Sequence, residues 1–211
     1  MKSISASEIE KIANNILQTE QITAPPILAT DIADFVYDLS FEKRNLDNCS
    51  TAGDVLAAIN ITAKVITINS SKDYELFSNE GRKNFTIAHE LGHYVLHRDM
   101  KRSSFVAPQT EIIFCREIGN FKGNIERQAD LFAVYLLMPE NLVRAEYDKI
   151  QQPFNECALR YLADKFCVSK QAMKNRLSWE LNLLYIDKDG KYYKNKAEFE
   201  FQEMGGQQKL F

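Results

Sequence analysis

Near the start of the chain, apolar residues recur every three or four positions, a spacing typical of amphipathic helices. The pattern predicts one helix over residues 5–19 and, after the break at Pro25-Pro26, a second over residues 29–36. Three β-like runs follow, and the last of them is the most strongly β-branched. The runs cover residues 36–41, 54–60 and 64–69. Since regular helical patterns do not separate them, they predict a small sheet and not an alternating βαβ series.

Helical periodicity dominates the rest of the chain, with one further β-like run at residues 111–116. The longest helical pattern covers residues 79–97, Asn124 is predicted to cap a helix that ends at residue 137, and Pro139 is predicted to start the next helix. After Pro153, two short helical patterns precede a hairpin signal, and these lie at residues 156–166, 169–183 and 184–193. The sequence therefore predicts an α+β fold in which a small mixed sheet packs against a helix bundle, with a C-terminal helical pair and hairpin.

The chain has 211 residues, of which 45% are apolar and 26% are charged, the profile of a soluble globular protein. Its net charge of −3 excludes a strongly cationic surface, so a contact with nucleic acid would need a local basic patch. The polar start predicts no secretory signal, and the lack of a long apolar run predicts no contact with a membrane. The four cysteines are scattered and predict thiols. We therefore expect a cytoplasmic protein.

The stretch that carries chemistry is His89-Glu90-Leu91-Gly92-His93, inside the longest predicted helix. Residues four apart lie on one face of a helix, so His89 and His93 can bind one ion through their ring nitrogens. Glu90 lies beside that ion without serving as a ligand, and can take a proton from a water that the ion activates. Zn²⁺ suits this set because catalytic zinc keeps three protein ligands and one open position. The alternative is a helix whose histidines only line a polar groove.

Two residues are candidates for the third ligand. His97 lies about 12 Å from His89 along the helix axis, which is too far for the two to share the ion. We therefore expect His97 to contact the ligands from outside the ligand set, to face the substrate, or to cap the helix. Glu126 is the better candidate because apolar neighbours dock its helix into the core. Asp130 lies one turn further on the same face and would orient His89 or His93 by accepting its free N–H. Taken alone, Glu-x-x-x-Asp is also typical of a solvated helix face.

Residues 84–97 (NFTIAHELGHYVLH) resemble the zinc-helix signature of the ImmA/IrrE metallopeptidase family, and residues 126–133 (ERQADLFA) with 136–139 (LLMP) resemble its second signature. The similarity extends over residues 8–180, although the family usually has Asn where this chain has Asp130. The resemblance implies a gluzincin-like peptidase with a zinc-binding helix bundle, often encoded near mobile elements. It also implies a regulatory role, since some members cleave or inactivate a DNA-binding repressor and others control a stress response.

The predicted organisation is a gluzincin-like metallopeptidase domain over residues 1–152, a helix-turn-helix-like pair plus hairpin over residues 153–198, and a flexible tail over residues 199–211. The tail ends in a Gln-x-x-Leu-Phe run, which resembles peptides that dock into bacterial sliding clamps and is otherwise an ordinary disordered end. We therefore make no functional prediction for the tail.

Residues 162–173 resemble a helix-turn-helix in which Ser169 caps the second helix. Lys170, Lys174 and Arg176 are predicted to face outward from it. The net charge around these helices is small for DNA binding, which needs several phosphate contacts. We therefore favour a helical pair that supports the peptidase domain, with direct DNA binding as the alternative.

The leading hypothesis is a zinc-dependent endopeptidase of regulatory type that hydrolyses a peptide bond in a partner protein, such as a helix-turn-helix repressor. In it, His89, His93 and Glu126 bind the metal and Glu90 is catalytic. The rival is a zinc-containing DNA- or protein-binding transcriptional regulator without peptidase activity. Glu90 favours the enzyme, because a structural zinc site has no use for a base beside the metal. The substrate, its cleavage site, the activating signal and the oligomeric state stay open.

Overall fold

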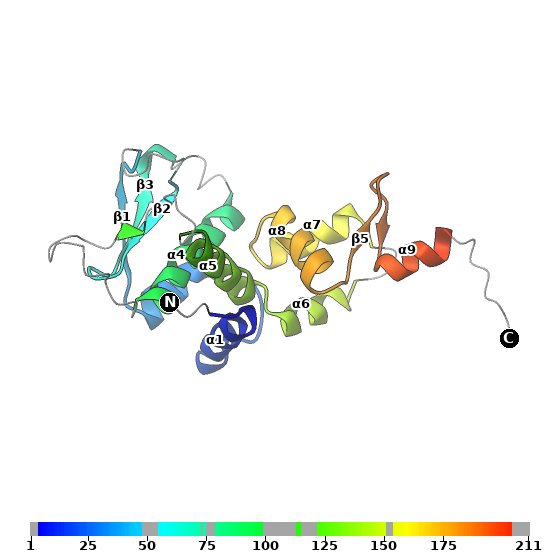
Figure 1. Cartoon of the computed structure of the whole chain (residues 1–211), viewed down its shortest axis with the longest axis horizontal. Coiled ribbons are helices and arrows are strands. Elements are labelled where there is room, and N and C mark those ends of the chain that lie inside the picture. The colour runs from blue at the N-terminus through cyan, green and yellow to red at the C-terminus, as the bar shows by residue number, and fades with distance from the viewer. Residues whose placement is uncertain are drawn as a thin grey trace.

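A four-stranded mixed sheet lies at one end of the molecule in the computed structural model (Figure 1). The structure describes residues 4–47, 55–72, 74, 79–98, 113–114, 122–150 and 154–203. β1 (Ser40–Arg44) runs parallel to β3 (Val65–Asn69), and β2 (Ala57–Asn60) is antiparallel to both β3 and β4 (Ile113–Phe114). The strand order is therefore β1-β3-β2-β4, with the β-branched run 65–68 inside the sheet.

The first predicted strand, over residues 36–41, is displaced in the structure. Val36 ends a short π-helical turn, η1 (Ile32–Val36), which follows α2 (Ala29–Asp31), and β1 begins only at Ser40. Asp38 adopts a left-handed backbone (φ 55°), and its N–H donates to the carbonyl of Asp34. The chain thus turns before the strand starts, a feature that hydrophobic periodicity does not encode.

The α+β class is confirmed, and all the remaining elements follow a predicted pattern except the short helical turn at residues 70–72 and the helix at residues 196–203, which were not predicted. The remaining elements are α1 (Ala6–Thr19), η2 (Ser70–Lys72), α4 (Glu80–His97), α5 (Lys122–Leu137), α6 (Glu140–Tyr147), α7 (Glu156–Lys165), α8 (Lys170–Asn175), η3 (Arg176–Glu180), β5 (Tyr185–Ile186), β6 (Tyr192–Tyr193) and α9 (Lys196–Glu203). The prediction that Asn124 caps a helix is wrong, since α5 begins at Lys122 and Asn124 lies inside its first turn. Sequence patterns fix the existence of a helix better than its first residue.

Helices α4 and α5 pack very closely, with α1 beside them (Figure 1). A Cβ atom built on Gly92 would lie 3.1 Å from the Cα of Ala129 and 3.1 Å from a ring carbon of Phe132. Glycine is therefore what allows the two helices to approach at this point. The approach matters because the residues with metal-ligand chemistry are divided between these two helices.

The C-terminal helical pair is in contact with the start of α4. The side-chain amide of Asn84 donates to the carbonyls of Cys167 (3.1 Å) and Ile27 (2.9 Å), and its oxygen accepts from the N–H of Ala29 (2.8 Å). A Cβ on Gly81 would lie 2.5 Å from the carbonyl carbon of Val168. The turn between α7 and α8 is thus held against the helix that carries the histidines.

Arg176 is buried, so the prediction that it faces outward is wrong. Its side chain is only 2% exposed, its Nε donates to the carbonyl of Met138 (3.0 Å), and its guanidinium is paired with Glu180 and lies over the ring of Tyr135. It is also 3.7 Å from Glu10 in α1. Because tertiary partners were available, a residue that periodicity placed on a solvated face instead joins η3 to the helical core.

The hairpin β5–β6 is confirmed, and α9 packs on it through Phe199, whose ring centroid is 5.0 Å from that of Tyr185. This helix continues to Glu203, past residue 199 where the flexible tail was predicted to begin. Residues 204–211, which contain the Gln-x-x-Leu-Phe run, lie outside the described residues.

Candidate metal centre

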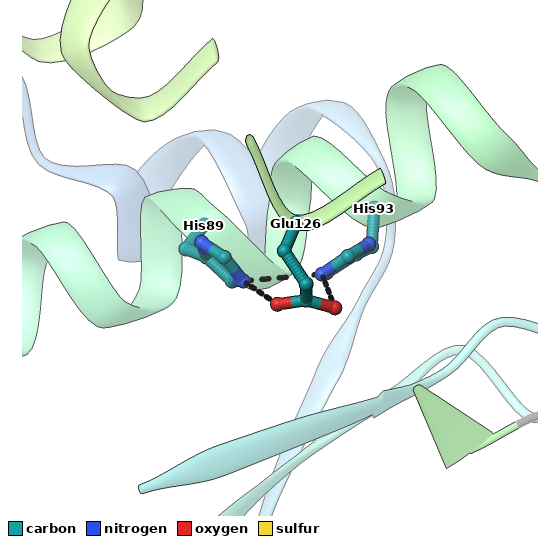
Figure 2. Close-up of side chains that lie close together, drawn as sticks. All are labelled: His89, His93 and Glu126. Atoms are coloured by element: carbon teal, nitrogen blue, oxygen red, sulfur yellow. Dashed lines mark hydrogen bonds and ion pairs between the residues drawn. The ribbon is translucent and has the colours of Figure 1, made fainter. Parts of the chain in front are cut away.

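Three side chains from two helices converge on one point (Figure 2). Asn79 caps the start of α4 by accepting from the N–H of Arg82, and further along this helix His89 and His93 project from one face. Glu126 reaches the same point from α5. All three are mostly shielded from solvent, with side-chain exposures of 14%, 2% and 21%.

The distances between the facing atoms match the requirements of a tetrahedral ion. The two histidine Nε2 atoms are 3.1 Å apart, and the Glu126 carboxylate oxygens lie 3.2 Å from Nε2 of His89 and 3.4 Å from Nε2 of His93. Ligand bonds of about 2.0–2.1 Å at tetrahedral angles place neighbouring donor atoms about 3.3 Å apart. Two imidazoles and a carboxylate at these separations fit a divalent metal ion, and this group can hold one.

Asp130 holds His89 from behind. Its Oδ1 is 2.8 Å from Nδ1 of His89, while Nε2 of the same ring faces Glu126. Burial lowers the pKa of His89, but the hydrogen bonds to Asp130 and Glu126 outweigh it and raise the pKa to about 10. Burial raises the pKa of Glu126, because it again disfavours the charged form. Hydrogen bonds from His89 and His93 outweigh this effect and hold the pKa of Glu126 far below its usual range. The His89 ring and the Glu126 carboxylate are therefore strongly coupled electrostatically.

His97 lies behind His93, on the side away from the ligand atoms. Its Nδ1 is 3.1 Å from Nδ1 of His93, and its Nε2 is 3.2 Å from Oε1 of Gln128. Burial lowers the pKa of His97 to about 4, with the nearby His93 acting in the same direction. The structure thus places His97 next to a candidate ligand but outside the ligand triangle, which is formed by His89, His93 and Glu126, as the helical geometry predicts. Sequence reasoning missed Gln128, which is only 4% exposed.

Glu90 is adjacent to the triangle but does not take part in it. The residue is 5% exposed, and the backbone of Ile59 in β2 acts to lower the pKa of its carboxyl group. Its Oε2 has no hydrogen-bond partner within the described part of the chain. Burial raises the pKa of Glu90, and the neighbouring His89 and His93 oppose that shift. Burying a carboxylate oxygen without a hydrogen-bond partner lowers the stability of the fold, and a catalytic role for the group would explain why this cost is tolerated.

A pocket of about 130 Å³ opens onto these groups, and its walls come from α4, from α5 and from the segment that leads into β2. Besides Glu90, Asp130 and the three converging residues, it is lined by Val55, Leu56, Ala57, Phe85 and Thr86. Sequence reasoning missed these lining residues. The only signal for the first three was an apolar β-like run, and such a run does not say which helix its strand will face.

A comparison with known protein families matches residues 36–178 to the IrrE N-terminal-like domain, Peptidase_M78. The chain belongs to this family. The Peptidase_M78 match includes Glu90 and the three converging residues, and it supports a metallopeptidase-type regulatory function.

Seven chains among the solved structures are similar, including a Mycobacterium tuberculosis transcriptional regulator that is 16% identical, with a TM-score of 0.49. The alignment covers 89% of this chain and 54% of that one, so this chain spans about half the length of that protein. No curated protein sequence matches. Within the described residues, every helix is too short or too polar to cross a membrane.

The Peptidase_M78 match extends through α7 and α8, the helix-turn-helix-like pair. Ser169 caps α8 as predicted, accepting from the N–H of Ala172. Of the three predicted outward cations, Arg176 is buried and Lys170 is paired with Glu156. The basic surface of the pair is therefore smaller than the sequence indicated, and DNA binding stays an untested prediction.

Proposed function

We propose that this chain is a zinc-dependent endopeptidase of regulatory type, which hydrolyses a peptide bond in a partner protein such as a helix-turn-helix repressor. The observation that carries the proposal is the carboxylate of Glu90, buried beside the ligand triangle with one oxygen unpartnered within the described residues. A purely structural metal site has no need of such a group, whereas hydrolysis requires a base there. Family membership supports the same class of activity.

In this proposal His89, His93 and Glu126 hold the metal, and Asp130 fixes His89 with its Nε2 toward the ion by accepting the proton of Nδ1. Zinc suits two imidazoles and one carboxylate, and when bound it supplies the Lewis acidity that polarises a peptide carbonyl and acidifies water. The pocket beside α4 opens onto this point, and we expect the scissile peptide bond to reach the metal through it.

Glu90 performs the proton transfers. Its free Oε2 accepts a proton from the attacking water, and burial favours the protonated carboxyl that results. The same carboxyl then donates that proton to the nitrogen of the departing amine, which makes the amine a better leaving group. The backbone of Ile59 in β2 favours the charged carboxylate that accepts the first proton.

The test is Glu90→Gln, which keeps the size of the side chain but removes the base. We expect full zinc content, an unchanged fold and cleavage of a candidate repressor reduced by ~10²-fold or more. Glu126→Ala should lose zinc as well as activity, whereas Glu140→Gln, on the partly exposed α6, should change neither. Zinc content by elemental analysis and cleavage by gel are the readouts. A Glu90→Gln variant that cuts as fast as the unmodified chain refutes the assignment of the base.

The rival regulator is tested by binding to duplex DNA. If the helical pair is a DNA-binding element, fluorescence anisotropy will show binding that weakens steeply with salt and is lost in a Lys170→Ala, Lys174→Ala double variant. We expect no salt-sensitive binding to duplex DNA, because Lys170 is already paired with Glu156 and Lys174 is partly buried.

A further inference from the structure

His93 is backed by a second imidazole and an amide, not by a carboxylate. Nδ1 of His93 lies 3.1 Å from Nδ1 of His97, and Nε2 of His97 lies 3.2 Å from Oε1 of Gln128. The three residues are 1%, 2% and 4% exposed, so solvent has little access to these contacts. They join the metal-facing helix α4 to α5 beneath the ligand triangle.

The proton positions along this series follow from one condition. If His93 presents Nε2 to a metal, its Nδ1 must carry the ring proton and donate it. His97 must then accept at Nδ1 and keep its own proton on Nε2. That N–H is directed at Oε1 of Gln128, which can only accept. Each assignment fixes the next, and a neutral His97 is the only form that satisfies both contacts.

The two candidate histidine ligands are therefore held differently. His89 is held by the carboxylate of Asp130, whereas His93 is held by a neutral ring. The site already contains the carboxylates of Glu90, Glu126 and Asp130. A neutral acceptor behind His93 orients it without placing a further negative charge near the metal, which would weaken the attraction of the ion for a carbonyl oxygen.

We infer that His97 is a positioning residue, which holds His93 with Nε2 toward the metal, and that Gln128 fixes the tautomer of His97 that makes this hold. The inference rests on the metal site proposed above. The sequence gives only the one-turn spacing from His93 to His97, whereas the role of Gln128 depends on how α5 packs against α4.

The test measures zinc affinity by competition with a chromophoric chelator. His97→Phe keeps a ring of similar size but removes the acceptor, and we expect zinc to bind about 10–100-fold more weakly. His97→Gln returns an acceptor oxygen and should recover part of that loss. Tyr94→Phe is the matched control, a buried aromatic residue on the same helix outside the series, and should bind zinc like the unmodified chain.

A second measurement needs no substitution at all. Nitrogen-15 NMR of the zinc-loaded protein, labelled at histidine, should show His97 with its proton on Nε2 and His93 with its proton on Nδ1. A His97 proton on Nδ1 overturns the inference, as does a His97→Phe variant that binds zinc as tightly as the unmodified chain. Failure of the unmodified chain to bind zinc would instead refute the proposed function, so the two failures are distinguishable.

Discussion

Because α4 and α5 approach so closely at Gly92, one added methyl group should weaken metal binding. In Gly92→Ala the new Cβ would lie 3.1 Å from the Cα of Ala129, 3.1 Å from a ring carbon of Phe132 and 3.2 Å from the carbonyl oxygen of Ala129. Ordinary contact begins at about 3.4 Å, so the helices must move apart by a few tenths of an ångström. Phe132 is fully buried, so moving its ring would disturb the surrounding core.

That movement acts on the ligand triangle, since His89 and His93 lie on α4 and Glu126 lies on α5. Metal sites tolerate deviations of only about 0.2 Å in ligand distance. The metal-free protein can relax by separating the helices, whereas zinc binding must bring them back together against the overpacking, which costs about 1–3 kcal/mol. We therefore expect zinc affinity to fall about tenfold, equivalent to about 1.4 kcal/mol.

The stability of the metal-free protein should change less. Alanine is favoured over glycine inside a helix by about 1 kcal/mol, which offsets part of the overpacking cost. Urea unfolding in the presence of a chelator measures this stability, and chelator competition measures zinc affinity. A folded Gly92→Ala variant that binds zinc as tightly as the unmodified chain would refute the reasoning.

Gly81→Ala is the matched control, because the same change on the same helix meets a different neighbour. Its Cβ would lie 2.5 Å from the backbone of Val168 in the turn of the helical pair, far from the ligands. We expect the free energy of unfolding to fall by about 2–3 kcal/mol, with zinc affinity almost unchanged. An equal loss of zinc affinity in both variants would show that the effect is general destabilisation and not movement of α5.

Two further predictions concern buried charge. Arg176→Met should lower the free energy of unfolding by about 3–5 kcal/mol, because it leaves the carbonyl of Met138 and nearby carboxylates unpaired. The control is Arg127→Met, at an exposed position, which should change the free energy of unfolding by less than about 0.5 kcal/mol. Urea unfolding of the two variants measures the difference. The metal-free protein should lose stability as the pH rises from 6.5 toward 10, because the pKa of His89 is raised from 6.5 to about 10 and its protonated form stabilises the fold fully only below 6.5. In His89→Phe, the free energy of unfolding should depend much less on pH across this range. An equally steep pH dependence in that variant would show that His89 is not its source.

Local pattern was sufficient wherever the relevant contact lies within one element. The spacing of His89 and His93 fixes their common face through the geometry of the helix alone, and Glu90 follows from its place between them. The hairpin at Asp189-Gly190 was equally local, because turn residues largely determine a tight turn. Glu126 needed one more step, since its selection depended on apolar neighbours that dock its helix into the core.

Other features were decided only when separate elements packed. The sequence left open whether Asp130 meets His89 or His93, and the packing of α5 on α4 places it against His89. The same packing brings Gln128 to His97. Arg176 looked like a surface cation, but contacts with α1 and with the carbonyl that follows α5 bury it. Helical and strand periods report which face of an element is apolar, whereas the partner of a polar side chain depends on the distances between elements, and these arise only from the tertiary fold.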